Sequence, residues 1–317
     1  MFIYAIKRLA ALVLTFFTVI VLVFCVIRLM PGNVFDDPDL TSAAREVLAE
    51  REMTGRPVLL QLADYIRRAV FYADFGVSLK IDPGVPVFSV LKQRLPITVI
   101  INFAALALAL PLGILLGVAA ALGRGAFSGK AVVFVTVMCV SVPSFVVAAL
   151  LQYFAAYRLG LAPGLYMPSA GFFERSRSLA LPVLALALAP AAIVTRLLRA
   201  ELIDAQNTDF MALARAKGLS PFRAAVNHGL RYAIVPLIPV LTLMFTDILA
   251  GSLVIERIFS IPGMGRVLID SITAKDHSLT MAVLIFYTFV ELAAMFLADL
   301  ALGAADPRIR LTGGKTA

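Results

Sequence analysis

The chain has 317 residues, of which 61% are hydrophobic and only 15% are charged. This composition lies far from the average of soluble globular proteins and excludes an ordinary soluble domain. The formal net charge of +8 is what basic loops beside membrane spans produce, so it does not call for a nucleic acid partner.

Six apolar runs are long enough to cross a hydrocarbon core of about 30 Å, which takes roughly 20 helical residues. The first run is followed by Arg28-Leu-Met-Pro31 instead of small residues, so we expect it to stay as an anchor and not to be cleaved as a signal peptide. The sequence therefore predicts an all-α integral membrane protein with spans at residues 9–27, 97–122, 131–157, 179–198, 234–255 and 279–302.

The spans suggest how the chain is organised. Outside the long loop after the first span, basic residues are more frequent on the side of the N-terminus, and long loops cross the membrane largely regardless of their charge. We therefore expect both termini in the cytoplasm. The predicted parts are an anchor helix at 1–30, an extracytoplasmic loop or lid at 31–95, a transmembrane core at 96–303 and a cytoplasmic tail at 304–317.

Polar side chains inside the spans are candidates for a translocation path. A charged group at the centre of a span costs about 2.5–3.5 kcal/mol on insertion scales, so such groups should face protein or water. For Asp247 the alternative to a place in the path is a structural hydrogen bond. Glu256 is expected at the membrane interface. The candidates are Asn102, Gln152, Asp247, Glu256 and Glu291.

Close helix packing is predicted by Gly113-Ile-Leu-Leu-Gly117 in the second span. A GxxxG pattern lets two helices approach, either within one chain or between two subunits.

The search for catalytic or metal chemistry finds no candidate in the sequence. His228 and His277 stand alone, and Cys25 and Cys139 lie in apolar runs as small hydrophobic residues do. The glycine-rich turn at 123–131 has the wrong spacing for a phosphate-binding loop and lacks the hydroxyl that would bind Mg²⁺. We expect no catalytic residue, no metal and no cofactor on this chain; if ATP is used, another chain must bind it.

A polar segment at 199–231 separates the fourth and fifth spans and has regular helix boundaries. Asn207, Thr208 and Asp209 offer N-caps, and Gly218 stands where a left-handed residue ends a helix. Ser220-Pro221 can then start a second helix.

The first of these two helices has the pattern of a docking element. Phe210, Leu213 and Ala214 are spaced to share a face, and the alanines beside them let another surface come close to the backbone. We therefore expect this helix to contact another protein.

Several motifs along the chain carry a family resemblance. Asp209-Phe-Met-Ala-Leu-Ala-Arg-Ala-Lys-Gly218 resembles the EAA-type loop of binding-protein-dependent ABC importer permeases, in the variant of the dipeptide/oligopeptide/nickel branch. Further segments of the chain resemble motifs of the same branch, and the segments near the N-terminus resemble its B-type subunit. They are Lys7-Arg-Leu9, Pro31-Gly32, Phe75-Gly-Val-Ser78, Leu230–Pro236, Val254–Gly265 and Asp306–Arg310.

The resemblance implies a type I ABC importer permease fold with six transmembrane helices and a cytoplasmic coupling loop at 200–231, in a bacterial inner membrane. It also implies a second, similar permease as partner, two ATPase subunits that hold ATP and Mg²⁺, and an extracytoplasmic binding protein. Phe210 and Leu213 replace the usual Tyr and Thr but keep a contact face. The residues expected to dock on an ATPase are Asp209, Phe210, Leu213, Ala214, Arg215, Ala216, Lys217 and Gly218.

Short peptides are the cargo that we expect first, with nickel or metal chelates, glutathione and opines as alternatives. A secondary transporter or channel subunit would also have six spans with acids inside them. It would have no reason for a capped docking helix, and it would not co-purify with an ATPase. An intramembrane enzyme would need a nucleophile or metal ligands within its spans.

Overall fold

The computed structural model describes residues 2–29 and 55–305, without the side chains of a few of them, Asp247 included. The predicted lid at 31–95 lies partly outside these residues, as do the motifs at Pro31-Gly32 and Asp306–Arg310. The described part of the chain is almost entirely helical, and its one β contact is an isolated bridge between Val77 and Pro86.

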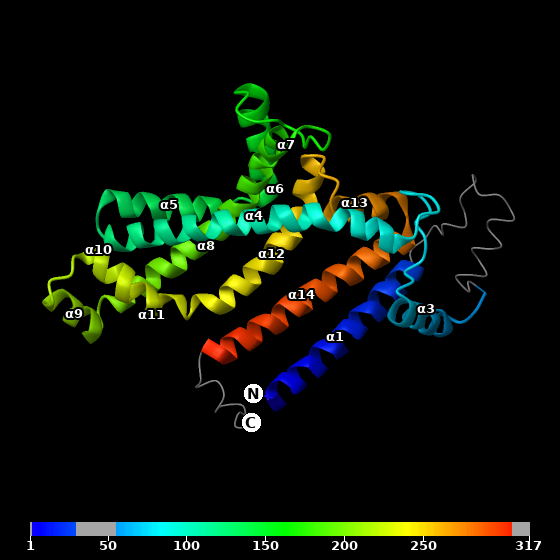
Figure 1. The fold of residues 1–317 in the computed structure, drawn as a ribbon, viewed down its shortest axis with the longest axis horizontal. Helices are drawn as coiled ribbons and strands as arrows, with labels where there is room; N and C mark the ends of the chain where they lie inside the picture. Colours follow the sequence, from blue (N-terminus) through cyan, green and yellow to red (C-terminus); the bar gives the residue numbers. More distant parts are fainter. Residues whose placement is uncertain (1, 30–54, 306–317) are drawn as a thin grey trace. The chain divides into compact units, whose positions relative to one another are not determined.

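A helix occupies each predicted span (Figure 1). Four stretches are each apolar and long enough to cross a membrane, namely Ala5–Arg28, Val87–Leu122, Phe172–Ala205 and His277–Leu300. The fifth predicted span corresponds to α12, whose 22 residues would extend about 33 Å at 1.5 Å per residue. The helices at the six spans are α1 (Phe2–Leu29), α4 (Val87–Leu122), α5 (Phe127–Ser141) with α6 (Ser144–Leu151), α8 (Ala180–Ala205), α12 (Leu237–Ile258) and α14 (His277–Ala305).

The third predicted span is broken. Phe127–Ser141 and Ser144–Arg158 form a pair bent by 101°, so two helices and not one occupy the predicted span at 131–157. Pro143 has no amide hydrogen and disfavours a helical residue before it, and Val142 is accordingly extended, with φ −94° and ψ 123°. The second arm ends in a π-helical segment, η2 (Gln152–Arg158).

The chain forms two compact units, with one division inside α4. The first unit comprises Thr98–Ile261 and the described residues from Leu297 onward. Its centre is α8, which packs against α5, α6, α11 (Leu230–Ile234) and α12. The core residues are Val118, Ala121, Val194, Leu198, Leu202, Ala233, Leu237 and Met244.

The GxxxG pattern brings α4 and α8 together inside this unit. A Cβ atom added at Gly113 would lie 2.7 Å from Cβ of Val194, and one at Gly117 would lie 3.0 Å from Cβ of Leu198. Thr195 crosses the same contact, since its hydroxyl donates to the Gly113 carbonyl at 3.3 Å. The packing of these glycines within one chain is therefore confirmed.

The second unit comprises Phe2–Ile97 and Pro262–Phe296. It includes α3 (Val58–Tyr72) and α13 (Met264–Ala274) besides α1 and the larger part of α14. Helix α3, from the loop predicted to lie outside the membrane, contributes to a core with α1 and α14 made of Ile20, Phe24, Ile27, Leu62, Tyr65, Met281 and Ile285.

Candidate functional site

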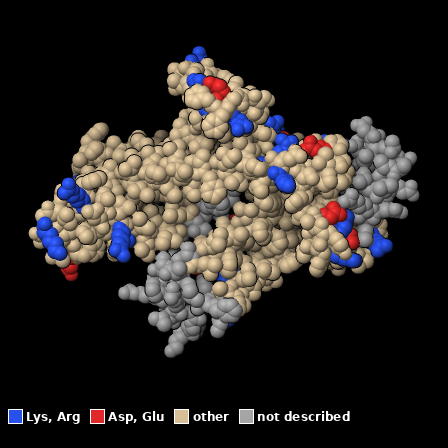
Figure 2. All heavy atoms as spheres, viewed as in Figure 1, with Lys and Arg blue, Asp and Glu red and all other residues tan. Residues whose placement is uncertain are grey.

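The candidate site is the polar segment that follows α8. It consists of α9 (Asp209–Ala216), α10 (Pro221–Ala224), the π-helical η3 (Ala225–Gly229) and α11, and Figure 1 shows these elements in succession. Figure 2 shows Lys and Arg side chains over α9 and α10. The predicted pair of short helices is therefore present.

The start of α9 is set at Thr208, which has the extended backbone of an N-cap, with φ −89° and ψ 156°. Its hydroxyl donates to the Ala205 carbonyl at 2.6 Å, so it ties α9 to the end of α8 instead of accepting from an amide of α9. Asp209 in the first turn complements the positive end of the helix dipole.

The end of α9 is a Schellman motif, which confirms the predicted glycine turn. Gly218 has φ +81°, in the left-handed region that glycine adopts without a Cβ penalty. Its amide donates to the Arg215 carbonyl at 2.9 Å, and the Leu219 amide donates to the Ala214 carbonyl at 3.2 Å. These two bonds and the contact of Leu219 with Ala214 define the motif.

The next helix starts as its sequence predicts. Ser220 is the N-cap, and its hydroxyl accepts from the Arg223 amide at 3.4 Å, while Pro221 occupies the first turn. The turn between α9 and α10 is therefore held at both ends by local hydrogen bonds.

A small core joins the two helices. Met211, Ala214 and Ala224 are each less than 5% exposed, and Leu219 packs against them. Ala214 thus lies on the inner side of α9, which corrects the expectation that it shares an accessible face with Phe210 and Leu213. The reason is that the Schellman turn folds α10 back over the Met211 and Ala214 side of the helix.

The outer side of α9 is free to meet a partner. Phe210 is 40% exposed and Leu213 is 57% exposed, while Ala212 and Ala216 are also exposed. We call these four residues the docking face. Lys217 is exposed beside it, whereas the Arg215 guanidinium donates to the Gln206 carbonyl at 3.0 Å. An apolar ridge with basic residues beside it suits a groove that has acidic residues at its edge.

Two path candidates are buried in the first unit and share a neighbour. The Asn102 side-chain amide donates to the Thr98 carbonyl at 2.6 Å, and its Oδ1 atom has no hydrogen bond among the described residues. Glu256 is 0% exposed and accepts from the Thr98 hydroxyl at 2.7 Å. The fold therefore encloses this carboxylate, and its expected level at the membrane interface remains a prediction.

The other three candidates are Gln152, Glu291 and Asp247. Gln152 donates to the carbonyls of Gly164 at 2.8 Å and Ile258 at 3.0 Å, so it joins a turn to the end of α12. Glu291 is exposed on α14. The side chain of Asp247 lies outside the described residues, so its predicted place in a path remains a prediction.

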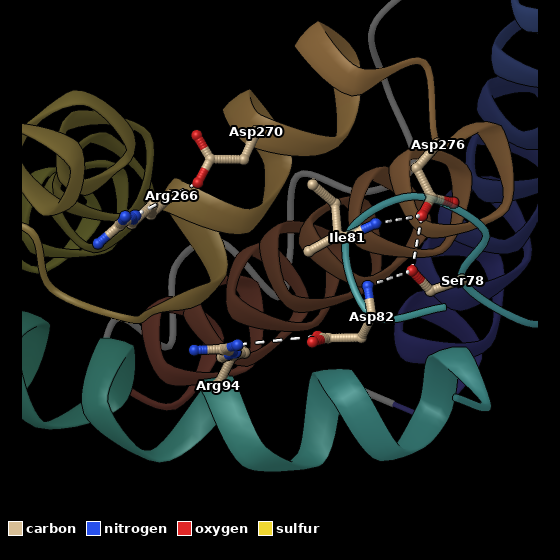
Figure 3. A network of polar contacts seen from close by, with 7 residues as sticks. All are labelled: Ser78, Ile81, Asp82, Arg94, Arg266, Asp270 and Asp276. Carbon is tan, nitrogen blue, oxygen red and sulfur yellow. Dashed lines mark hydrogen bonds and ion pairs between the residues drawn. The ribbon is translucent and has the colours of Figure 1, made fainter. Parts of the chain in front are cut away.

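Sequence reasoning missed a buried polar cluster in the second unit (Figure 3). Asp276 is 0% exposed, and its Oδ2 atom accepts from the Ser78 hydroxyl at 2.6 Å and from the amides of Leu79, Lys80 and Ile81 at 3.0, 3.0 and 3.3 Å. The same carboxylate caps α14, since Oδ1 accepts from the Leu279 amide at 3.3 Å. One side chain thus fastens the segment before α4 to the start of the last helix.

Part of this cluster has a signal in the sequence. An Asp directly before a long helix predicts an N-cap, and Ser78 belongs to the Phe75–Ser78 motif. No local pattern indicates that two positions 198 residues apart meet. Among the described residues no group of three or more His, Cys, Asp or Glu side chains could hold a metal.

Residues 113–311 match the family model described as the binding-protein-dependent transport system inner membrane component. The chain belongs to this family. It is 36% identical over 308 residues to the dipeptide transport system permease protein DppB of Lactococcus lactis, covering 97% of this chain and 99% of that protein. Bacillus subtilis DppB is 36% identical over 309 residues, with 97% and 98% covered. Escherichia coli K12 GsiC, a glutathione transport system permease protein, is 30% identical over 310 residues, with 97% and 98% covered.

Solved structures agree on the fold. An inward-facing structure of the MetNI methionine ABC transporter matches with a TM-score of 0.57 at 16% identity, covering 68% of this chain and 96% of that one. A crystal structure of an amino acid ABC transporter matches with a TM-score of 0.51 at 20% identity, covering 68% and 94%. The predicted type I importer permease fold, the resemblance to the dipeptide branch and the B-type subunit are thereby confirmed.

The Schellman turn generates a first prediction. Gly218→Val should disrupt the turn, because a β-branched residue at positive φ costs on the order of 1–3 kcal/mol. A Cβ atom at Gly218 would meet nothing within 4 Å, so the strain comes from the backbone alone. Hydrogen exchange should show faster exchange of the amides of residues 218 and 219 in this variant.

Two further variants make the result specific. Gly218→Asn should keep nearly the original protection, because Asn tolerates the left-handed region. Gly125→Val places the same strain at φ +91° in another open turn and should leave residues 218 and 219 unchanged. Unaltered protection in Gly218→Val would show that the turn does not depend on this glycine.

A second prediction concerns the Asp276 cluster. Asp276→Ala removes the acceptor of five donors and should destabilise the second unit by about 3 kcal/mol. Cys25 lies in that unit and is half-buried, so it can report the loss. In a Cys139→Ser background, the rate at which a thiol-reactive dye labels Cys25 during heating should rise.

The matched control is Asp270→Ala. Asp270 pairs with Arg266 at 3.3 Å, but the two side chains are 33% and 39% exposed, and a pair of this kind contributes about 0–1 kcal/mol. Equal labelling of Cys25 in both variants would show that the Asp276 contacts contribute no more than a surface pair.

Proposed function

We propose that this permease subunit imports short peptides and forms half of their path through the membrane. The chain is a membrane component of a binding-protein-dependent importer. Two relatives named for dipeptide transport and one named for glutathione, itself a small peptide, align with nearly the whole chain. Nickel, metal chelates and opines remain alternative cargoes of the same architecture.

In this proposal the docking face of α9 couples the permease to an ATPase subunit. The single observation that supports it best is that α9 is locked by its turn and its small core while Phe210 and Leu213 stay exposed. A rigid element transmits a push from a partner to α8, to which Thr208 and Arg215 fasten it. Hydrolysis takes place on the partner, which holds ATP and Mg²⁺, and this chain supplies no catalytic residue and no cofactor.

The proposed assembly has a second, related permease as a heterodimer partner, two ATPase subunits beneath the pair and a substrate-binding protein outside. Both termini and α9 lie in the cytoplasm of a bacterial cell whose inner membrane the chain spans. The family's description, which names an inner membrane component that depends on a binding protein, supports the membrane and the binding protein.

A third prediction tests the docking face and the function together. The chain is co-expressed with its neighbouring genes and purified in lipid nanodiscs, and ATPase activity is measured as peptide-loaded binding protein is added. Leu213→Asp places a charge on the docking face and should lower the stimulated rate at least about tenfold, since burying an unpaired charge costs more than the 1.4 kcal/mol that a factor of ten represents. Gly218→Val should lower it too.

The control variant is Leu161→Asp. Leu161 is 63% exposed in the turn before α7 (Phe172–Ser178), at the other end of α8 from α9, so this variant should still co-purify with the ATPase and keep its unstimulated ATPase rate. If no ATPase co-purifies with the folded chain, the coupling role is refuted and the secondary transporter or channel class becomes the better explanation. If an ATPase co-purifies but loaded binding proteins do not stimulate it, the peptide cargo is refuted.

We also propose that Glu291 faces the translocation path. An exposed carboxylate at this depth of a span must meet water or a partner, and its charge would attract the amino terminus of a peptide. The fourth prediction is that Glu291→Gln slows uptake of a dipeptide with a free amino terminus into proteoliposomes and leaves uptake of its N-acetylated form unchanged. Equal effects on both cargoes would remove Glu291 from recognition of the amino group.

A further inference from the structure

A cavity of about 510 Å³ lies between α5 and α8 in the first unit, outside every site described above. Its wall is largely aliphatic, with Val133 and Val137 from α5 and Ile193 and Leu197 from α8. Val137 is 46% exposed, and Arg196 at the rim is exposed as well. The cavity is therefore a groove that a molecule can enter from the side.

Two guanidinium groups in the groove lack partners. Arg196 and Arg199 both line it, three positions apart and hence on one face of α8. Neither side chain has an ion pair or hydrogen bond among the described residues, and Nε of Arg199 is buried without a partner. No Asp or Glu lines the groove. A buried guanidinium nitrogen such as Nε of Arg199 needs an oxygen acceptor, and phosphate or carboxylate oxygens match the geometry of a guanidinium group.

The hydroxyl groups in the wall do not change this requirement. Thr136 donates to the Val133 carbonyl at 2.8 Å, and the Thr195 hydroxyl is shared between the carbonyls of Ala191 at 2.7 Å and Gly113 at 3.3 Å. Each hydroxyl has a single hydrogen to donate, so the arginines supply the donors for a ligand. The groove therefore selects an anion that also carries hydrocarbon to cover the aliphatic wall.

The position of the arginines fits the headgroup level of a membrane. Arg199 lies six residues before the end of α8 at Ala205, which is about 9 Å along the helix, and the polar segment with α9 follows directly. The outer side of α5 beside the groove is apolar, with Phe134 67% and Met138 51% exposed, as expected of a surface that meets acyl chains. Basic pockets between membrane helices at this level bind anionic lipid headgroups.

We propose that this groove binds one anionic phospholipid, such as phosphatidylglycerol. Arg196 and Arg199 hold the phosphate, and an acyl chain covers Val133, Val137, Ile193 and Leu197. The bound lipid joins α5 to α8, and α8 is the helix that leads into α9 and its docking face. This inference does not depend on the cargo or on the ATPase partners.

Native mass spectrometry of the full chain tests the proposal, with phosphatidylglycerol and phosphatidylcholine of the same acyl chains as probes. The wild type should retain a phosphatidylglycerol adduct about 30-fold better than a phosphatidylcholine adduct, from two arginines near the surface. The double variant R196Q/R199Q should lose this preference. R124Q/R231Q removes two exposed charges elsewhere and should keep it.

Two more variants cover the case in which the glutamine pair does not fold. R196K/R199K keeps both charges and should keep a preference for phosphatidylglycerol. Val137→Trp fills the open side of the groove without touching the arginines and should reduce retention of the lipid.

Three outcomes would overturn the proposal. The first is an unchanged preference in the folded R196Q/R199Q variant or, if that variant does not fold, unchanged retention of phosphatidylglycerol in Val137→Trp. The second is complete displacement of the lipid by millimolar inorganic phosphate, which would identify a plain phosphate site. The third is loss of the adduct when the chain is bound to its partner permease, which would show that protein covers the groove.

Discussion

The close contact of α4 with α8 at Gly113 and Gly117 is the interaction on which the first unit depends. Lipid tails are as apolar as leucine, so helices in a membrane gain little from hydrophobic burial and associate mainly through tight packing. At these glycines the backbone of α4 approaches α8 so closely that a Cβ atom at Gly113 would clash with Val194 at 2.7 Å. Helix α8 can then hold α5, α6, α11 and α12 around it and carry α9 at its end.

The hydrogen-bonding needs of polar groups are met in different ways in different parts of this chain. Inside the helical core the Thr98 hydroxyl donates to the buried Glu256 carboxylate. Asp276 instead collects several donors from a segment distant in the sequence, because a buried carboxylate is stable only when its acceptor sites are filled. The arginines of the α5–α8 groove are the contrasting case, since their donors stay unfilled among the described residues.

Helix α9 shows how a short helix becomes rigid outside a large core. An isolated helix of eight residues is far below the length that is stable in water. Helix α9 persists because both ends are tied by hydrogen bonds and because Met211 and Ala214 are covered by α10. Covering one side leaves Phe210 and Leu213 on the other, so the same packing that stabilises the helix also produces the face offered to a partner.

Local chemistry determined much of this protein from its sequence. The long apolar helices follow from the length of the apolar runs, and the bounds of α9 follow from Thr208 and Gly218, whose preferences act over a few residues. Tertiary structure decided the rest. It placed Ala214 inward, enclosed Glu256 beside Thr98 and joined Ser78 to Asp276. These outcomes depend on which surfaces meet across long sequence separations, and neither periodicity nor capping residues carry that information.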